Sequence, residues 1–223
     1  MLSFWDEDPE WLYRSVKSAG KVCDTLLALD GPYTLFPGAT QKPRSSRAEV
    51  DAIDQAGLDA GMLVRVLRMG VWYDGEVGKR TYLLNWAALA GGDWLFRIDA
   101  DEEVLYAPDD LGSTLAVTPH HVAATTFYYW HLESGGWLSA PLRVLFRRLP
   151  AMWVAGHHAR IMALDDRGKL VKMYEPDADR DDCPQAPVRV IPGFTMKHYA
   201  QDRNPERQAT KDEYYARMRC VEQ

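Results

Sequence analysis

The first half of the chain alternates between apolar positions at helical spacing and short continuous apolar runs. Asp8-Pro9 is typical of a helix start and Gly20 of a helix end, so we expect a helix between them. Ser46 and Glu49 form a capping-box pattern, which predicts the start of a second helix. The other expected elements are a helix over 79–90 and strands over 22–29, 62–67 and 94–98. Strands that alternate with helices favour a parallel sheet, and the expected fold class is therefore α/β.

The pattern changes after about Leu111, where runs rich in β-branched and aromatic residues are typical of strands. Strands are expected over 122–130, 142–146 and 153–161, and then over either 188–191 or 194–196. A polar stretch over 177–187 predicts a loop, and Asn204-Pro205 predicts the start of a final helix. We expect the change near residue 111 to separate two halves of a single domain spanning 1–223.

Composition and charge exclude some classes of protein. The net charge of −6 argues against a general nucleic-acid binder, whose surface would be basic. The three cysteines (Cys23, Cys183 and Cys220) form no metal-spaced pair and no closed disulfide set, so we expect reduced thiols in a cytoplasmic protein. No apolar run reaches the roughly 18 residues of a membrane span, and residues 1–10 carry no signal-peptide pattern. Nothing in the sequence sets an oligomeric state.

The strongest candidate for chemistry is the end of the apolar run 94–98, where Asp99 and Asp101 follow with one alanine between them. In an extended chain these two carboxylates would face the same way. Mg²⁺ and Mn²⁺ prefer oxygen ligands and often join a carboxylate to substrate phosphates. Asp30 also follows a buried strand, and ligands of parallel sheets bind at the carboxyl ends of the strands. The sequence therefore predicts a metal-assisted site for a nucleotide-diphosphate donor at this edge.

Two parts of the chain resemble family 2 glycosyltransferases of the GT-A fold. The first runs from Leu2-Ser3-Phe4-Trp5-Asp6-Glu7 to Leu27-Ala28-Leu29-Asp30, with Asp6-Glu7 where many relatives have Asn-Glu. The second has Lys79-Arg80, Asn85 and Ala88 in a helix, then Gly92-Asp93-Trp94-Leu95, leading into the DxD signature Asp99-Ala100-Asp101. The resemblance covers about residues 1–110. It implies a mostly parallel central sheet flanked by helices, a donor-binding half (1–110) and an acceptor-binding half (111–223) with a C-terminal helix.

The resemblance also implies roles for individual residues. Asp30 would recognise the nucleobase in a pocket shaped by Tyr33, and Lys79 or Arg80 would position the donor. Asp99 would hold the ribose or share the metal, while Asp101 and His198, within Met196-Lys197-His198-Tyr199, would coordinate it. Arg203, with Arg207 and Lys211 at helical spacing beyond it, is a candidate for phosphate contact.

The implied reaction transfers a sugar from a nucleotide-sugar, with a UDP-sugar as the expected donor, to a saccharide or other hydroxyl acceptor. It would depend on Mn²⁺ or Mg²⁺, and the family implies inversion at the anomeric carbon. Inversion needs a base for the acceptor hydroxyl, and the candidates are Glu133, then His158 and Asp165. His158 stands where some relatives have a glutamate, in the segment Trp153-Val154-Ala155-Gly156-His157-His158.

Two alternatives remain open. A nucleotidyltransferase would also use carboxylate-held Mg²⁺, but it would carry a glycine-rich, basic loop where this chain has Asp6-Glu7-Asp8-Pro9. A non-catalytic carbohydrate-binding protein would use aromatic side chains as stacking platforms. The candidates for such platforms are Trp72, Tyr73, Trp130 and Trp137.

Overall fold

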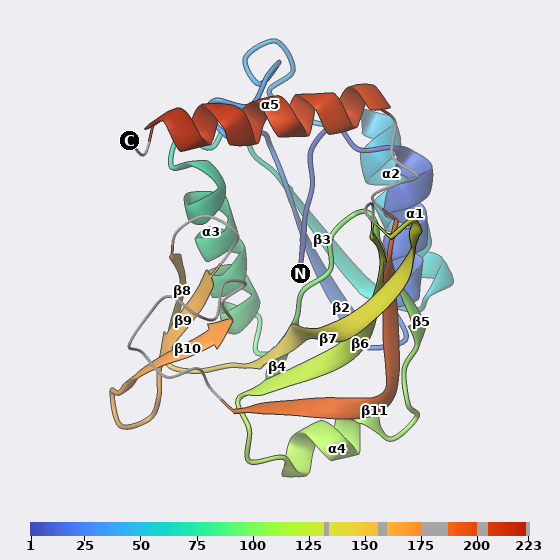
Figure 1. Cartoon of the computed structure of the whole chain (residues 1–223), viewed down its shortest axis with the longest axis vertical. Helices are drawn as coiled ribbons and strands as arrows, with labels where there is room; N and C mark the ends of the chain where they lie inside the picture. The colour runs from blue at the N-terminus through green and yellow to red at the C-terminus, as the bar shows by residue number, and fades with distance from the viewer. Residues whose placement is uncertain (132–133, 156–159, 175–186, 200–204, 222–223) are drawn as a thin grey trace.

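The protein has a mixed α/β fold with its strands in three sheets (Figure 1). The computed structural model describes residues 1–131, 134–155, 160–174, 187–199 and 205–221. The first sheet is parallel and has the strand order β1-β2-β3. Its strands and the helices that follow them in the chain are β1 (Leu2–Ser3), α1 (Pro9–Ala19), β2 (Thr25–Asp30), α2 (Arg47–Asp59), β3 (Leu63–Arg68) and α3 (Gly75–Leu89).

Strand β2 is buried on both faces, as its continuous apolar run predicts. Leu26 and Ala28 pack into the cluster that contains the inner faces of α1 and α2. Leu27 and Leu29 point the other way, into the cluster that contains α3. Because successive side chains of a strand alternate, this single strand joins two hydrophobic cores.

The helix ends follow the local signals closely. The Asp8 carboxylate accepts the Glu10 N–H at the start of α1, and Gly20 follows its last turn. Ser46 and Glu49 form both bonds of the capping box that opens α2. Helix α3 begins at Gly75, four residues before the expected start, and its first turn therefore includes Glu76.

The second sheet has the order β4-β7-β6-β11-β5, and in it only β6 and β11 pair in parallel. The expectation of a mostly parallel central sheet is therefore wrong for this part of the fold. Near the middle of β11 the register shifts between Val190 and Thr195, and Gly193 adopts a φ of 77°. This irregularity bends the strand sharply, so that the sheet curls (Figure 1). The elements are β4 (Trp94–Phe96), β5 (Glu102–Tyr106), α4 (Leu111–Val117), β6 (Val122–His131), β7 (Gly136–Arg147) and β11 (Val188–His198).

The third sheet is antiparallel and packs beside α3 (Figure 1). It comprises β8 (Ala151–Ala155), β9 (Arg160–Leu164) and β10 (Leu170–Tyr174). The single strand expected over 153–161 is wrong, because β8 and β9 are separate strands. Of the loop expected over 177–187, all but residue 187 lies outside the described residues.

The final helix, α5 (Pro205–Val221), begins at the expected proline and lies across one edge of the parallel sheet (Figure 1). Arg207 fixes it there, since its Nη2 donates to the Trp5 carbonyl at 2.5 Å and to Glu7 Oε1 at 3.1 Å. No helix in the described part of the chain is long and apolar enough to cross a membrane.

Candidate functional site

The carboxyl ends of the parallel strands meet at the edge that α5 covers. Leu2 of β1 pairs in parallel with Ala28 of β2 and forms a parallel bridge to Ile98. The residues that follow these strands, Phe4, Gly31 and Asp99, therefore emerge at one edge of the sheet. This is where a parallel α/β sheet binds its ligands.

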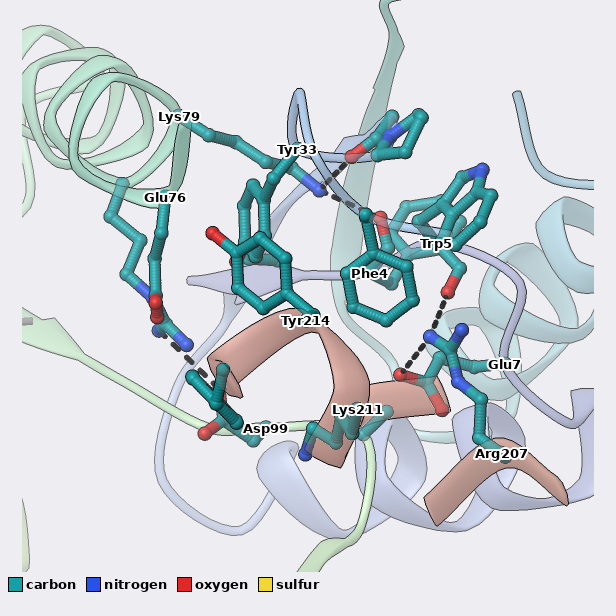
Figure 2. A pocket seen from close by; sticks show the side chains of 17 residues that line it. Phe4, Trp5, Glu7, Tyr33, Glu76, Lys79, Asp99, Arg207, Lys211 and Tyr214 are labelled. Carbon is teal, nitrogen blue, oxygen red and sulfur yellow. Dashed lines mark hydrogen bonds and ion pairs between the residues drawn. The ribbon is translucent and has the colours of Figure 1, made fainter. Parts of the chain in front are cut away.

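An inner pocket of about 110 Å³ opens at this edge (Figure 2). Aromatic rings and charged groups from both ends of the chain share its walls. The lining residues include Phe4, Trp5, Glu7, Tyr33, Phe36, Glu76, Lys79, Arg80, Asp99, Arg207, Lys211 and Tyr214.

Lys79 forms the base of this pocket and is almost completely buried. Its ammonium donates to the carbonyl oxygens of Phe4 at 2.8 Å and Gly31 at 2.7 Å, and so ties together the segments after β1 and β2. Burial lowers the pKa of Lys79 to about 7, while the carboxylate of Asp30 acts in the opposite direction. The predicted donor-binding lysine therefore shapes the pocket from beneath.

Arg80 links two carboxylates on the pocket wall. Its Nε donates to Glu76 Oε1 at 2.7 Å, and its Nη1 lies 3.5 Å from Asp99 Oδ1. Burial acts to raise the pKa of Asp99, but the charges of Arg80 and then Arg97 outweigh it and lower that pKa. The other oxygen of Glu76 is buried and has no hydrogen-bond partner among the described residues.

Tyr214 of α5 fills the aromatic part of the pocket. Its ring stacks on Phe36 with centroids 5.0 Å apart and lies 5.6 Å from the ring of Tyr33. The Tyr214 hydroxyl is buried and finds no hydrogen-bond partner in the described part of the chain. Buried polar atoms are normally hydrogen-bonded, so the Glu76 oxygen and the Tyr214 hydroxyl are free to form hydrogen bonds with a ligand in the pocket.

A larger outer cleft of about 780 Å³ lies beside the inner pocket and shares Trp5, Glu7, Ala100 and Arg207 with it. Asp101 lines this cleft, and its Oδ2 lies 2.9 Å from Nε2 of His198. Burial acts to lower the pKa of His198, but the hydrogen bond and charge of Asp101 outweigh it and raise that pKa. The structure therefore brings together two of the three predicted metal ligands, although 97 residues separate them.

The third predicted ligand faces elsewhere, because the chain turns directly after Asp99. The Glu102 N–H donates to the Asp99 carbonyl at 3.1 Å, which places Ala100 and Asp101 in a turn. Asp99 then lines the inner pocket and Asp101 the outer cleft, so the expectation that both carboxylates point the same way is wrong. Glu102 braces the turn by accepting the Asp99 N–H at 2.9 Å. Burial, with the nearby charge of Asp99, raises the pKa of Glu102 to about 7.

Asp30 lies at the expected edge, but its carboxylate is fully buried. It accepts the backbone N–H groups of Gly31 and Ser45, and the guanidinium of Arg68 approaches to 3.7 Å. The side chain therefore braces the loop between β2 and α2 in this structure. Its role toward a nucleobase stays a prediction.

The remaining candidates divide into three groups. Glu133, His158 and Arg203 lie outside the described residues. Asp165 is half-buried, and its Oδ1 accepts the N–H groups of Arg167 and Lys169 in a turn. Of the proposed aromatic platforms, Trp130 and Trp137 contact each other, whereas Trp72 packs on Tyr82 and Tyr73 is exposed.

The structure adds site residues that the sequence reasoning passed over. Glu76 stands one helical turn before Arg80. This spacing indicates an ion pair between them, but the expected helix began only at residue 79 and left Glu76 outside it. Tyr214 belongs to the expected final helix, but nothing local indicates that this helix returns to the first strand. Glu102 looks like one of several solvated acidic residues, and only its burial distinguishes it.

Comparison with known proteins gives no match for this chain, either among protein-family models or among curated protein sequences.

Proposed function

We propose that the chain is a metal-dependent glycosyltransferase of the GT-A type, which takes a sugar from a nucleotide-diphosphate sugar. The observation that carries this proposal is the pair formed by Asp101 and His198 at the carboxyl edge of the sheet. Asp101 lines the outer cleft, and this cleft adjoins the inner pocket, which contains cations and aromatic rings. A nucleotide-sugar donor needs a metal site and cations for its diphosphate, hydrogen-bond acceptors for its ribose and aromatic rings for its base, all close together.

The chemistry of the pair fits a Mn²⁺ or Mg²⁺ ion with an incomplete protein shell. Two ligands at right angles on such an ion would stand about 3 Å apart, close to the 2.9 Å between Asp101 Oδ2 and His198 Nε2. No group of three or more His, Cys, Asp or Glu side chains that could together hold a metal ion occurs within the described residues. Waters and substrate phosphates would then complete the shell, which is common for Mg²⁺. When bound, the ion would supply Lewis-acid stabilisation of the leaving diphosphate.

The inner pocket suits the nucleoside of the donor. Tyr33, Phe36 and Trp5 offer ring faces on which a base can stack. Arg207 of α5 also lines the outer cleft, and Lys211 lies between Arg207 and Asp99 (Figure 2). There the two cations would neutralise phosphate charge. Carboxylate oxygens are suitable acceptors for ribose hydroxyls, and Asp99 lines this pocket.

The size of the pocket sets a condition for binding. Its volume of about 110 Å³ is below the roughly 300–1,000 Å³ of small-molecule sites, because Tyr214 occupies the space beside Tyr33 and Phe36. A nucleoside would enter as the Tyr214 ring leaves, and it could meet the polar atoms of Glu76. Helix α5 would therefore cover the donor site in the unbound protein and uncover it when the donor binds.

A panel of labelled nucleotide-sugars with Mn²⁺ tests the proposal. We expect release of the nucleoside diphosphate from at least one donor, abolished by Asp101→Asn. Asp93→Asn is the matched control, since the Asp93 side chain is 93% exposed and stands outside both hollows. Release of a sugar phosphate would instead indicate a nucleotidyltransferase, and no turnover of any donor would contradict the proposal.

A further inference from the structure

A row of aromatic rings crosses the surface from the β6–β7 hairpin to the outer cleft. Its members, which we call the aromatic strip, are Trp130, Trp137, Tyr199 and Trp11. Successive ring centroids lie 5.7, 6.5 and 5.2 Å apart. These residues come from the hairpin, from the position directly after β11 and from helix α1, and the three elements lie side by side (Figure 1). Three distant parts of the sequence therefore build one continuous surface.

The strip ends at the candidate reaction centre. Trp11 lines the outer cleft together with Asp101. The Tyr199 N–H donates to the Asp101 carbonyl at 2.8 Å, and Tyr199 directly follows His198 in the chain. A molecule lying along the rings would thus bring one end to the cleft that holds the Asp101–His198 pair.

Long cationic side chains lie over three of the rings, and each ring of the strip stays partly exposed. Trp137 is 40% exposed although it is a large apolar residue. The Lys197 ammonium lies 4.0 Å from the ring centre of Trp137 and 4.5 Å from that of Tyr199. The Arg14 guanidinium lies 4.7 Å from the ring centre of Trp11. These cation–π contacts fix the ring orientations before any ligand binds.

We propose that the aromatic strip binds the acceptor and that this acceptor is a neutral oligosaccharide. Rings of Trp and Tyr present an apolar face with a polar edge, which complements the C–H face and hydroxyl rim of a pyranose. The length of the row, four successive side chains, favours a chain of sugars over a single one. The role of the bound saccharide as acceptor rests on the proposed function, whereas saccharide binding itself does not.

The local charges disfavour two other partners. Besides the Lys197 ammonium, the row carries the Arg14–Glu103 pair at 3.0 Å and, at its end, the carboxylate of Asp101, so positive and negative groups alternate along it. A single-stranded nucleic acid or an anionic membrane would need an excess of positive charge around the rings. The net charge of −6 for the whole chain adds to this argument.

Native affinity electrophoresis through gels that contain dextran, galactomannan or arabinogalactan tests the strip directly. We expect at least one polysaccharide to retard the protein, and Trp137→Ala to weaken that retardation about tenfold. Trp11→Ala, at the other end of the row, should weaken it similarly. Tyr106→Ala is the matched control, because Tyr106 is 54% exposed and lies in β5, outside the strip. Thermal melting of each variant checks that it is folded.

Retardation by none of the three polysaccharides would overturn the proposal, as would equal retardation of Trp137→Ala and the unaltered protein. Binding to a single-stranded oligonucleotide or to vesicles of anionic lipid, without retardation, would also overturn it. UDP binding, measured in parallel, separates this proposal from the proposed function. Retardation without UDP binding would support the strip and identify a non-catalytic carbohydrate-binding protein.

Discussion

Replacing Lys79 with methionine should remove a specific pH dependence from the stability of the fold. Lys79 is only 1% exposed, and its ammonium donates to the carbonyls of Phe4 and Gly31. Burial is the largest cause that lowers its pKa to about 7; the charge of Asp30 opposes this effect and that of Arg80 adds to it. Methionine has a similar length and no charge, so the variant keeps most of the packing.

The sign and size of the effect follow from proton linkage. In the unfolded chain a lysine has a pKa of about 10.4. Below pH 7 both states hold the proton, and stability does not change through this group. Between about pH 7 and pH 10 only the unfolded state keeps the proton, so the free energy of unfolding rises with pH. With a folded pKa of about 7, the rise from pH 7 to pH 9 is about 2 kcal/mol.

Urea unfolding at pH 7 and pH 9, at one salt concentration, measures this rise in the unaltered protein and in Lys79→Met. The rise in the free energy of unfolding should be about 2 kcal/mol smaller in the variant. Lys21→Met is the matched control, because Lys21 also donates to two backbone carbonyls, those of Val104 and Leu105, but lies at the surface. The reasoning is refuted if Lys79→Met and the unaltered protein gain the same stability between the two pH values.

Four further substitutions test the pocket and the helix ends. Tyr214→Phe should raise the free energy of unfolding by up to about 1 kcal/mol in urea titration, because it removes a buried hydroxyl without a described partner. Tyr214→Ala should lower it by about 3 kcal/mol yet bind UDP about tenfold more tightly in calorimetry, because no ring must leave the pocket; weaker binding would contradict this. Ser46→Ala should cost about 1 kcal/mol in the same titration through loss of the capping box with Glu49. Arg207→Met should cost about 1–3 kcal/mol and expose α5 to limited proteolysis, since Glu7 loses its half-buried partner; unchanged cleavage would count against this anchor.

The local elements of the first half could be predicted because their signals are local. The apolar run of β2, the Asp8 cap and the Ser46 capping box each act over a few residues, and the structure confirms all three. Strand β5 was missed because Glu102 and Glu103 suggest a solvated loop. It becomes a strand only by pairing with β11, almost a hundred residues later in the chain. Such pairings have no local signature.

The candidate site was predictable only in part, for a similar reason. The position of Asp101 near His198 was expected from resemblance, and the structure brings the two side chains together. The opposite directions of the Asp99 and Asp101 side chains were not expected, because they depend on a turn that the buried Glu102 stabilises. The cover formed by α5 was missed too, because the contacts of Arg207 and Tyr214 with the first strands join the two ends of the chain.

Isothermal titration calorimetry of UDP, with and without Mn²⁺, tests the central claim most directly. We expect UDP to bind the unaltered protein and the Asp93→Asn control in the presence of Mn²⁺, and to bind both far more weakly without it. Asp101→Asn, checked for folding by circular dichroism, should lose the part of the affinity that depends on Mn²⁺. Absence of UDP binding, or binding that neither Mn²⁺ nor Asp101→Asn alters, would contradict a metal–diphosphate site between the inner pocket and the outer cleft.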